Sequence, residues 1–509
     1  MPHFVAVFVF TIVTVVFFAP AIFEGKTLPQ HDVMQGESGS RELTKYRNET
    51  GEEGLWSSSM FAGMPGYLLD VRYSGELTKY VHHAFGLFLP HPYSLIFISF
   101  LSCYIMLLAF GVRSWLAIAG GLAFGLTEFS IIGLNAGHNS KIAAVAFMPL
   151  VLAGIQMAFN RKLLLGFAVT ALALAMELRV SHLQITYYLM LMVLIFGFSK
   201  LVIAIKSKTL PEFAKTIAVL VVAAGLAVGA NIGNLWSVME YSKYSTRGKG
   251  ELTSVGAAKS GLDRDYAFQY SNGIFEPLVL FIPNFFGGAS QQDLGKNSNL
   301  ENALKANGAN RQQIAQQVKS APAYWGDQPA TAPYYAGAIV VFLFVLGLIV
   351  LPGSQKWWVL AIVVLGVVLS WGSNFGFNDW MFDYFPGYNK FRSITFVIII
   401  TVLAMIIGGF TGLEKLLSAE EKDAQSTSKQ LFIALGVAGG FALLCVLFAG
   451  MGGYKGAIDA RLASYPEWFL GALRADRASL LRMDALRSLF FILLFGAAIW
   501  LLIKKKFTA

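Results

Sequence analysis

The chain has 509 residues, of which 56% are hydrophobic and only 14% carry a charged side chain. A soluble globular protein has about 25% charged residues, so the composition excludes an ordinary soluble domain and indicates lipid as the solvent for much of the chain. The net charge of +9 does not indicate nucleic-acid binding, because the positive side chains lie in short loops between apolar runs. We therefore expect the bilayer, and no nucleic acid, as a partner.

Apolar runs of spanning length recur along the whole sequence. The run at 4–23 is expected to be a retained first span, because it lacks the basic start and the cleavage site of a signal peptide. A span needs about 20 residues. The other runs lie at 93–111, 115–133, 141–158, 163–178, 184–204, 214–234, 333–351, 357–371, 393–413, 430–450 and 489–503. The sequence predicts an all-α polytopic membrane protein with about twelve transmembrane helices in a single domain, 1–509.

The distribution of Lys and Arg predicts the orientation. If the N-terminus is cytoplasmic, every inside loop is basic, and the opposite face keeps few short-loop cations, notably Lys141 and Arg179. The inside cations are Arg113, Arg161, Lys162, Lys206, Lys208, Lys215, Lys356, Lys415, Lys422, Lys429 and Lys504–Lys506. Both termini are then cytoplasmic, and the longer outer loops lie at 24–92, 235–332, 372–392 and 451–488. Half-length apolar stretches in these loops predict interfacial or re-entrant helices.

The first outer loop offers a candidate catalytic carboxylate. It opens with Gln30-His31-Asp32-Val33-Met34-Gln35, directly after the first span. A carboxylate held rigidly beside a span is suited to act as a general base or a metal ligand. The alternatives for Asp32 are a solvated loop residue or a helix N-cap.

Two short outer loops are rich in polar groups that suit a phosphate or a ligand. In the run 135–141, we expect His138, Asn139 and Lys141 to hold an anionic phosphate, or else Asn139 or Ser140 to cap the next helix. In the run 177–184, ionisable groups at a helix end are costly unless they are paired or face water. Glu177 and Arg179 are expected to pair or to serve the site, and His182 to be a ligand or an interfacial residue.

Three aromatic and polar clusters follow in the later outer loops. Trp and Tyr beside amides and carboxylates suit sugar binding by stacking and hydrogen bonds, but they are also common at membrane interfaces. The candidate residues are Asp263, Asp265, Tyr324, Trp325, Asp327, Gln328, Tyr388 and Arg392. Arg392 is expected to grip a phosphate or to anchor a helix end by snorkelling.

Other chemistries have no motif in the sequence. GxxxxGK[ST], GxSxG, HExxH and a CxxC pair are all lacking. Each polar motif is weak by itself, and the common placement on one predicted face is the stronger signal.

An ordered set of motifs resembles one family. The runs GLNAGHNSK, ELRVSHLQITYY, DRDYAFQYSNGIFEPLVLFIPNFFGG, YWGDQPATAPYYAGAI, LSWGSN and PGYNKFRS, in that order, resemble the YfhO family, especially its Bacteroidetes-type members. That family is placed in the GT-C superfamily of membrane glycosyltransferases. Family members are often longer, and the outer region after the eleventh span is short here.

The resemblance implies a GT-C architecture, a polyprenyl-phosphate-sugar donor and an acidic residue in the first outer loop. Asp32 matches that position within a DxxQ pattern completed by Gln35. The expected activity is transfer of the sugar to an envelope glycan, lipid or protein on the outer face of a bacterial cytoplasmic membrane. A divalent metal, Mg or Mn, on Asp32, Glu177 and His182 is left open. The rival readings are a transporter or lipid flippase, and a non-catalytic scaffold for envelope assembly.

Overall fold

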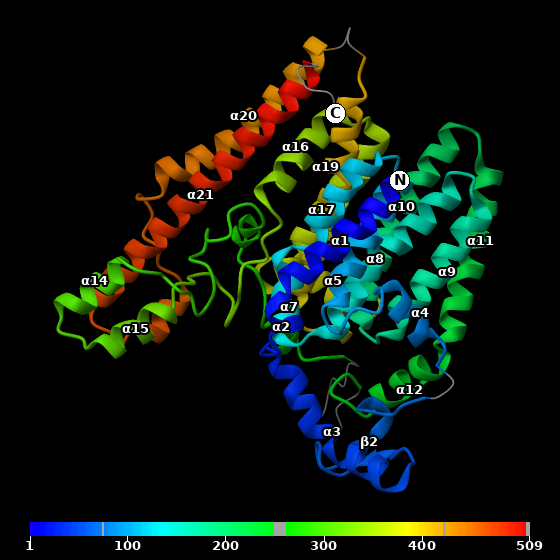
Figure 1. Cartoon of the computed structure of the whole chain (residues 1–509), viewed down its shortest axis with the longest axis horizontal. Helices are drawn as coiled ribbons and strands as arrows, with labels where there is room; N and C mark the ends of the chain where they lie inside the picture. The colour runs from blue at the N-terminus through cyan, green and yellow to red at the C-terminus, as the bar shows by residue number, and fades with distance from the viewer. Residues whose placement is uncertain (74–75, 249–260, 421–423, 505–509) are drawn as a thin grey trace. The chain divides into compact units, whose positions relative to one another are not determined.

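The computed structural model describes residues 1–73, 76–248, 261–420 and 424–504 (Figure 1). These residues are mainly helical, with one short antiparallel pair of strands, β1 (Trp56–Ser57) and β2 (Met64–Pro65). The described part therefore confirms the all-α prediction.

Among the described residues, seven helices are long and apolar enough to cross a membrane. They are α8 (Asn139–Phe159), α10 (Leu183–Lys206), α11 (Leu210–Ala230), α17 (Gly353–Ser370), α19 (Ile398–Leu417, with the preceding turn η5, Ile394–Val397), α20 (Ala424–Phe448) and α21 (Glu467–Ile503). An eighth span is present if α6 (Ser114–Gly125) and α7 (Glu128–Ala136), bent by 41°, cross together. The chain is thus a multi-pass membrane protein.

The remaining apolar runs of the sequence also lie on helices, but these are shorter. They are α1 (Pro2–Phe17) with α2 (Ala19–Phe23), α5 (Ser94–Ala109), α9 (Leu163–Arg179) and α16 (Ala338–Val350). Several expected boundaries differ from the observed ones. The first run is interrupted at Phe18, before Pro20, and the last run is only the C-terminal part of the long α21. A proline lacks the amide that helix continuation needs, which explains the first interruption.

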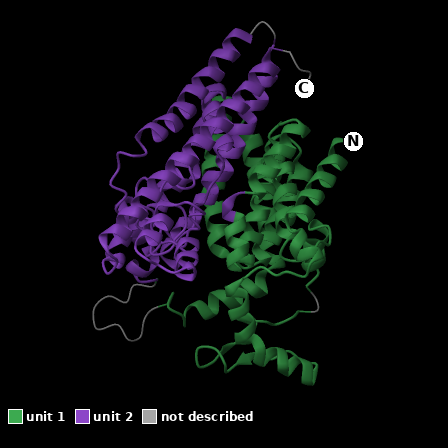
Figure 2. Ribbon diagram, turned by 60° about the vertical axis from the view of Figure 1, so that its left-hand side comes forward, with its two compact units in different colours: residues 1–126, 130–261 green, residues 127–129, 262–509 purple. Residues whose placement is uncertain are grey.

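The chain divides into two compact units (Figure 2). Unit 1 comprises residues 1–126 and 130–261, and unit 2 comprises 127–129 and 262–509. Each unit contains several of the candidate spans.

Unit 1 is built around α8, in which 89% of the residues of the apolar stretch are buried. Helices α5 and α9 pack on α8, and α11 packs on α9. Only 17% of the residues in the apolar stretch of α11 are buried within the protein, although the helix is strongly apolar. Most of its side chains therefore face lipid.

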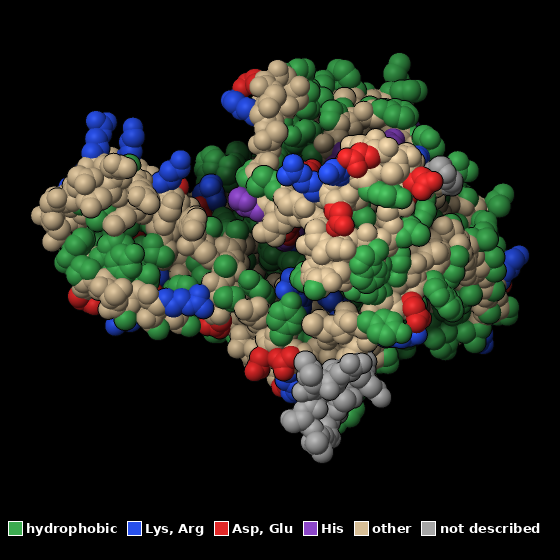
Figure 3. Space-filling model, turned by 90° about the horizontal axis from the view of Figure 1, so that it is seen from below, with side chains coloured by type: hydrophobic (Ala, Val, Ile, Leu, Met, Phe, Trp, Pro, Cys, Tyr) green, Lys and Arg blue, Asp and Glu red, His purple; other side chains and the backbone are tan. Residues whose placement is uncertain are grey.

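The polar elements of unit 1 gather at the end away from its N-terminus (Figure 1). They are α3 (His31–Thr50), the two strands, η1 (Gly66–Leu68), α4 (Thr78–Phe85) and α12 (Ile232–Ser242). Figure 3 views the protein from this end, and basic and acidic side chains both lie among polar surface there. The charges indicate that this end is in water.

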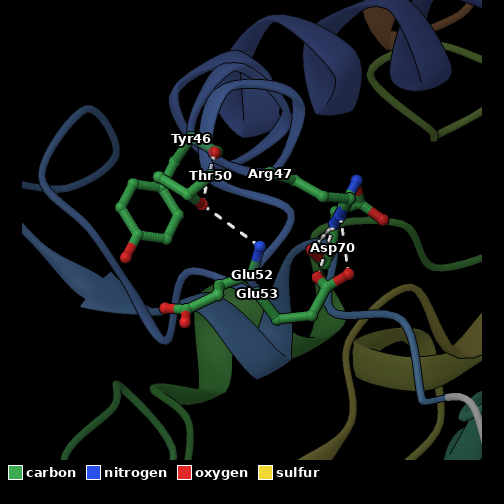
Figure 4. A network of polar contacts seen from close by, with 6 residues as sticks. All are labelled: Tyr46, Arg47, Thr50, Glu52, Glu53 and Asp70. Atoms are coloured by element: carbon green, nitrogen blue, oxygen red, sulfur yellow. Dashed lines mark hydrogen bonds and ion pairs between the residues drawn. The ribbon is translucent and has the colours of Figure 1, made fainter.

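Arg47 fixes the segment that follows α3. Its guanidinium donates to both carboxylate oxygens of Glu53, at 2.7 and 2.8 Å, and to Asp70 Oδ2 at 3.0 Å (Figure 4). The Arg47 side chain is only 10% exposed, so these charge-assisted bonds are partly shielded from water. Arg47 therefore holds the loop from Glu53 to Asp70 against α3.

Unit 2 contains two groups of packed helices. Helices α16, α17 and α19 pack together, and α20 pairs with α21. Helices α14 (Asn299–Ala306) and α15 (Arg311–Lys319) contribute to a small apolar core with the first turns of α21, including Leu300, Val318 and Leu473. The shorter elements are α13 (Arg264–Phe268), η2 (Glu276–Leu280), η3 (Gly372–Asn374), α18 (Phe377–Tyr384), η4 (Tyr388–Lys390) and η7 (Ala457–Leu462).

Candidate functional site

The start of α3 is fixed onto the turn between α7 and α8. Gln30 precedes α3 in a left-handed conformation, with φ 37°. Its backbone N–H donates to Asn135 O at 3.1 Å, and its side-chain Nε2 donates to Leu134 O and to Asn139 Oδ1, each at 2.9 Å. A Cβ at Gly137, where φ is +91°, would lie 3.0 Å from Val33 N. Glycine therefore permits the close approach that brings the two segments together.

Asp32, His138 and Lys141 form a chain of polar contacts at this junction. Asp32 Oδ2 lies 2.9 Å from His138 Nε2, and Lys141 Nζ lies 2.7 Å from His138 Nδ1. An ammonium group has no acceptor capacity, so Lys141 donates to Nδ1 and the Nε2–H of a neutral His138 donates to Asp32. The imidazole thus connects a carboxylate with an ammonium group.

The two ends of this chain differ in exposure. The side chain of Asp32 is 57% exposed, whereas Lys141 is 3% exposed. A substrate can reach the carboxylate, while the ammonium stays inside unit 1. Neither Asp32 nor Asn139 is a helix cap: Gln30 precedes α3, His138 precedes α8, and neither helix has a side-chain cap bond. The capping alternatives for these residues are therefore wrong.

Gln35 lies one turn after Asp32 on α3 and is exposed. Residues three apart share a helix face, so Asp32 and Gln35 are presented to the same side. The acidic Asp32 also sits in the first turn of α3, where a negative charge interacts favourably with the helix dipole.

Glu177 and His182 lie deeper in unit 1. Glu177 is fully buried, and its two oxygens accept from Thr186 Oγ1 at 2.8 and 3.0 Å. His182 directly precedes α10, and its Nδ1 is buried with no hydrogen-bond partner among the described residues. Burial, assisted by the nearby positive charge of Lys141, lowers the pKa of His182 to about 4. His182 is therefore neutral at physiological pH.

Arg179 does not pair with Glu177, contrary to one sequence-based expectation. Its Nε forms an ion pair with Glu76 of the first outer loop. Residues two apart on a helix point to different sides, which explains why Glu177 and Arg179 have separate partners. The Arg179–Glu76 pair joins the end of α9 to the segment before α4.

Asp32, Glu177 and His182 are the residues that the sequence offers as ligands of a divalent metal. Within the described ranges, no three His, Cys, Asp or Glu side chains gather in a way that could hold a metal ion. The three residues thus do not meet as a ligand set.

Unit 2 holds a second polar cluster, around Glu276. Glu276 is 3% exposed and accepts hydrogen bonds from the Tyr324 hydroxyl and the Gly273 amide. Gln328 is also buried: its amide N–H donates to the Tyr324 oxygen, and its Nε2 donates to Asn272 Oδ1, each at 2.8 Å. Burial raises the pKa of Glu276 to about 7, with a smaller contribution from the nearby negative charge of Asp327. Tyr324 and Gln328 are therefore bound to protein groups, and Asp327 lies beside them.

The remaining candidates of unit 2 have protein partners as well. The Trp325 ring lies 4.5 Å from the Phe286 ring, measured between centroids. The buried Tyr388 donates to Asn378 Oδ1 at 3.0 Å. Asp263 caps α13 by accepting from Tyr266 N at 3.1 Å, and Asp265 lies in the first turn of that helix. Arg392 donates to the Tyr266 hydroxyl and lies 5.2 Å from the centre of its ring.

No family model, curated protein or solved structure matches the chain. Function therefore has to be argued from the geometry of the described residues.

Three residues that take part in these networks were not singled out from the sequence. Gln30 lies in the quoted first-loop motif, but its role depends on a left-handed backbone that the motif does not reveal. Thr186 lies inside an apolar run. Glu276 stands alone in an apolar stretch, and an isolated acid of this kind is the signal by which the cluster could have been found.

Proposed function

We propose that the protein is an inverting glycosyltransferase with a GT-C-like architecture. It would move a sugar from a polyprenyl-phosphate donor to an envelope acceptor at the outer face of a bacterial cytoplasmic membrane. The observation that supports this most is the contact chain Asp32–His138–Lys141 at the charged end of unit 1. In this chain of contacts an exposed carboxylate lies beside the start of α8, which is long and apolar enough to cross a membrane.

The proposed reaction is a single displacement. Asp32 accepts the proton of the acceptor hydroxyl while the hydroxyl oxygen attacks the anomeric carbon of the sugar. The bond between that carbon and the donor phosphate breaks, and its electron pair leaves with the lipid phosphate. His138 holds one carboxylate oxygen at 2.9 Å, so the side chain is positioned before the substrate arrives.

Charge near the leaving phosphate is supplied by unit 1 in this proposal. Lys141 is buried behind His138 and contributes a positive potential at short range. His138 and Asn139 lie at the start of α8, where the helix dipole also favours an anion. Arg179 already pairs with Glu76, so it reaches a phosphate only if that contact is exchanged.

The proposal includes the finer topology predicted from the sequence. All twelve apolar runs then cross the membrane, both termini are cytoplasmic, and the charged end of unit 1 faces outward. The positive-inside distribution of Lys and Arg supports this orientation.

The deciding experiment is mass spectrometry of surface glycans and lipid-linked sugars, with and without the gene. We expect the deletion strain to lose one sugar from its envelope glycan and to accumulate the polyprenyl-phosphate sugar on the outer leaflet. The wild-type gene should restore the sugar, and a gene carrying Asp32→Asn should not. Accumulation of the donor on the inner leaflet would favour a flippase, and unchanged glycans would reject the transferase.

A further inference from the structure

A hollow of about 390 Å³ lies at the opposite end of α8 from Asp32 and His138. It is formed by the last residues of α5, by Gln156 and Asn160 near the end of α8, and by Lys162. Helix α8 has 21 residues and is therefore about 30 Å long. The hollow is thus separated from the candidate transferase site by roughly the thickness of a bilayer core.

One side chain in this hollow lacks a partner for its acceptor atom. Gln156 is 9% exposed, and its Nε2 donates to Asn160 Oδ1 at 3.2 Å. Asn160 Nδ2 in turn donates to Ala109 O at 3.1 Å. The Gln156 Oε1 atom is buried and has no hydrogen-bond partner among the described residues. A buried acceptor without a donor is unfavourable, so a ligand that offers an N–H or O–H group is stabilised here.

The charge of the hollow indicates an anionic group on the same ligand. Lys162 is exposed and carries a positive charge. Among the described residues that line the hollow, none is Asp or Glu. A lysine ammonium binds a phosphate as a point charge. The lining therefore suits a phosphate ester that also carries a hydrogen-bond donor.

The adjoining surface is apolar. The groove beside it, of about 450 Å³, is lined by Leu163, Leu164 and Phe167 of α9 and by Val219 and Val222 of α11. It begins one residue after Lys162, and Leu164 and Val222 are 82% and 57% exposed. Because α11 is a candidate span with little of its surface buried, these side chains face acyl chains.

We propose that this place binds a phospholipid whose headgroup carries a hydrogen-bond donor, such as ethanolamine or glycerol. The lipid phosphate pairs with Lys162, and the headgroup ammonium or hydroxyl donates to Gln156 Oε1. One acyl chain lies in the groove between α9 and α11. This binding is independent of the proposed sugar transfer.

The test uses the full chain in nanodiscs of phosphatidylcholine, to which phosphatidylethanolamine or phosphatidylglycerol is added. Choline has no N–H or O–H donor, so phosphatidylcholine serves as the reference lipid. Bound lipid is measured by native mass spectrometry, and the unfolding temperature by tryptophan fluorescence. We expect both added lipids to bind and to raise the unfolding temperature of the wild type.

Two variants separate the two contacts. Gln156→Leu removes the acceptor and should weaken phosphatidylethanolamine binding about ten-fold, as expected for one charge-assisted hydrogen bond. Because the variant also loses the bond from Nε2 to Asn160 Oδ1, each lipid's effect is measured against the same variant in phosphatidylcholine alone. Lys162→Gln should weaken all phospholipids, whereas Lys206→Gln, an exposed cation outside the described lining, should not.

Free phosphate is the other source of the same chemistry. Inorganic phosphate and glycerol phosphate are therefore added separately to phosphatidylcholine nanodiscs. If either one alone gives the full rise in unfolding temperature, the lipid is the wrong occupant. Unchanged phosphatidylethanolamine binding in both Gln156→Leu and Lys162→Gln would overturn the site itself.

Discussion

The Nε2 atom of His138 lies 2.9 Å from the Oδ2 atom of Asp32, across the junction of α3 and α8. Because Lys141 donates to the other ring nitrogen, the protein environment selects the His138 tautomer that donates to Asp32. An exposed carboxylate thereby obtains a fixed orientation from a buried ammonium group.

Asp32→Asn is expected to lower sugar transfer by about 10²–10⁴-fold, because a general base contributes a factor of that size. Asparagine keeps the size of the side chain and can still accept from His138, so folding should be preserved. The rate is measured with purified protein and a polyprenyl-phosphate sugar, and the unfolding temperature is measured in parallel. Glu37→Gln, which removes an exposed charge from the same helix, is the matched control. Full transfer by folded Asp32→Asn would remove Asp32 from the mechanism.

Lys141→Met is expected to reduce kcat about ten- to hundred-fold, the equivalent of one charge-assisted hydrogen bond. Without the ammonium donor, His138 no longer has a preferred tautomer and loses its fixed contact with Asp32. The unfolding temperature is measured in parallel, because methionine removes the buried ammonium group together with its bond to His138. Steady-state kinetics with varied donor lipid distinguish two roles. A fall in kcat at constant KM indicates positioning, whereas a rise in KM indicates that Lys141 contacts the donor phosphate.

The helices of the membrane region could be predicted from the sequence, since each apolar run lies on a helix of the structure. The polar helix α3 could not, because a helix that is polar on all sides has no apolar periodicity. The sequence did place Asp32, His138 and Lys141 on one predicted face. Their contact depends on the left-handed Gln30 and on the close approach at Gly137, which no spacing rule reveals.

Contacts between residues far apart in the sequence could not be predicted either. Arg179 pairs with Glu76 rather than with the adjacent Glu177, and Glu276 bonds to Tyr324. These contacts arise when separate segments pack, so composition and periodicity identify the residues but not the pairs. Tyr324 and Gln328 illustrate the consequence, because their burial within protein contacts was not visible in a motif that suits sugar binding.

The orientation of the chain is tested with single cysteines in intact cells. Cysteines at Ser140 and Asn389 are expected to react with a membrane-impermeant thiol reagent from outside, and a cysteine at Lys208 is expected to react only after lysis. The reason is the excess of Lys and Arg in the loops assigned to the cytoplasm. Cys103 and Cys445 are replaced by Ser first, so that labelling reports the new thiol alone. Labelling of the Lys208 site in intact cells would reverse the orientation and remove the outer-face site.

Glu276→Gln is expected to change how stability depends on pH. Burial raises the pKa of Glu276 to about 7 from 4.5, so the folded protein holds this proton longer than the unfolded chain does. The stabilisation by the neutral acid is complete below pH 4.5 and is lost as the pH rises through 7. The full difference is about 3 kcal/mol. Glutamine stays neutral, so the variant should gain stability relative to the wild type between pH 5 and pH 8.

The measurement is the unfolding temperature in detergent at each pH, and the quantity of interest is the difference between variant and wild type. Burial lowers the pKa of His82 and of His182 to about 4, so both histidines reduce stability as the pH falls below 6.5. This contribution is the same in the variant and the wild type, and it cancels when the difference is taken. Glu301→Gln is the matched control in the same unit, because the hydrogen bond from Lys305 lowers the pKa of Glu301 and keeps its titration below this range. An amide beside Tyr324 and Gly273 also changes the stability by an amount that does not depend on pH. This change shifts the curve of unfolding temperature against pH without altering its slope. Parallel curves for Glu276→Gln and the wild type would therefore show that Glu276 is already ionised at pH 5, and that its contacts with Tyr324 and Gly273 outweigh burial.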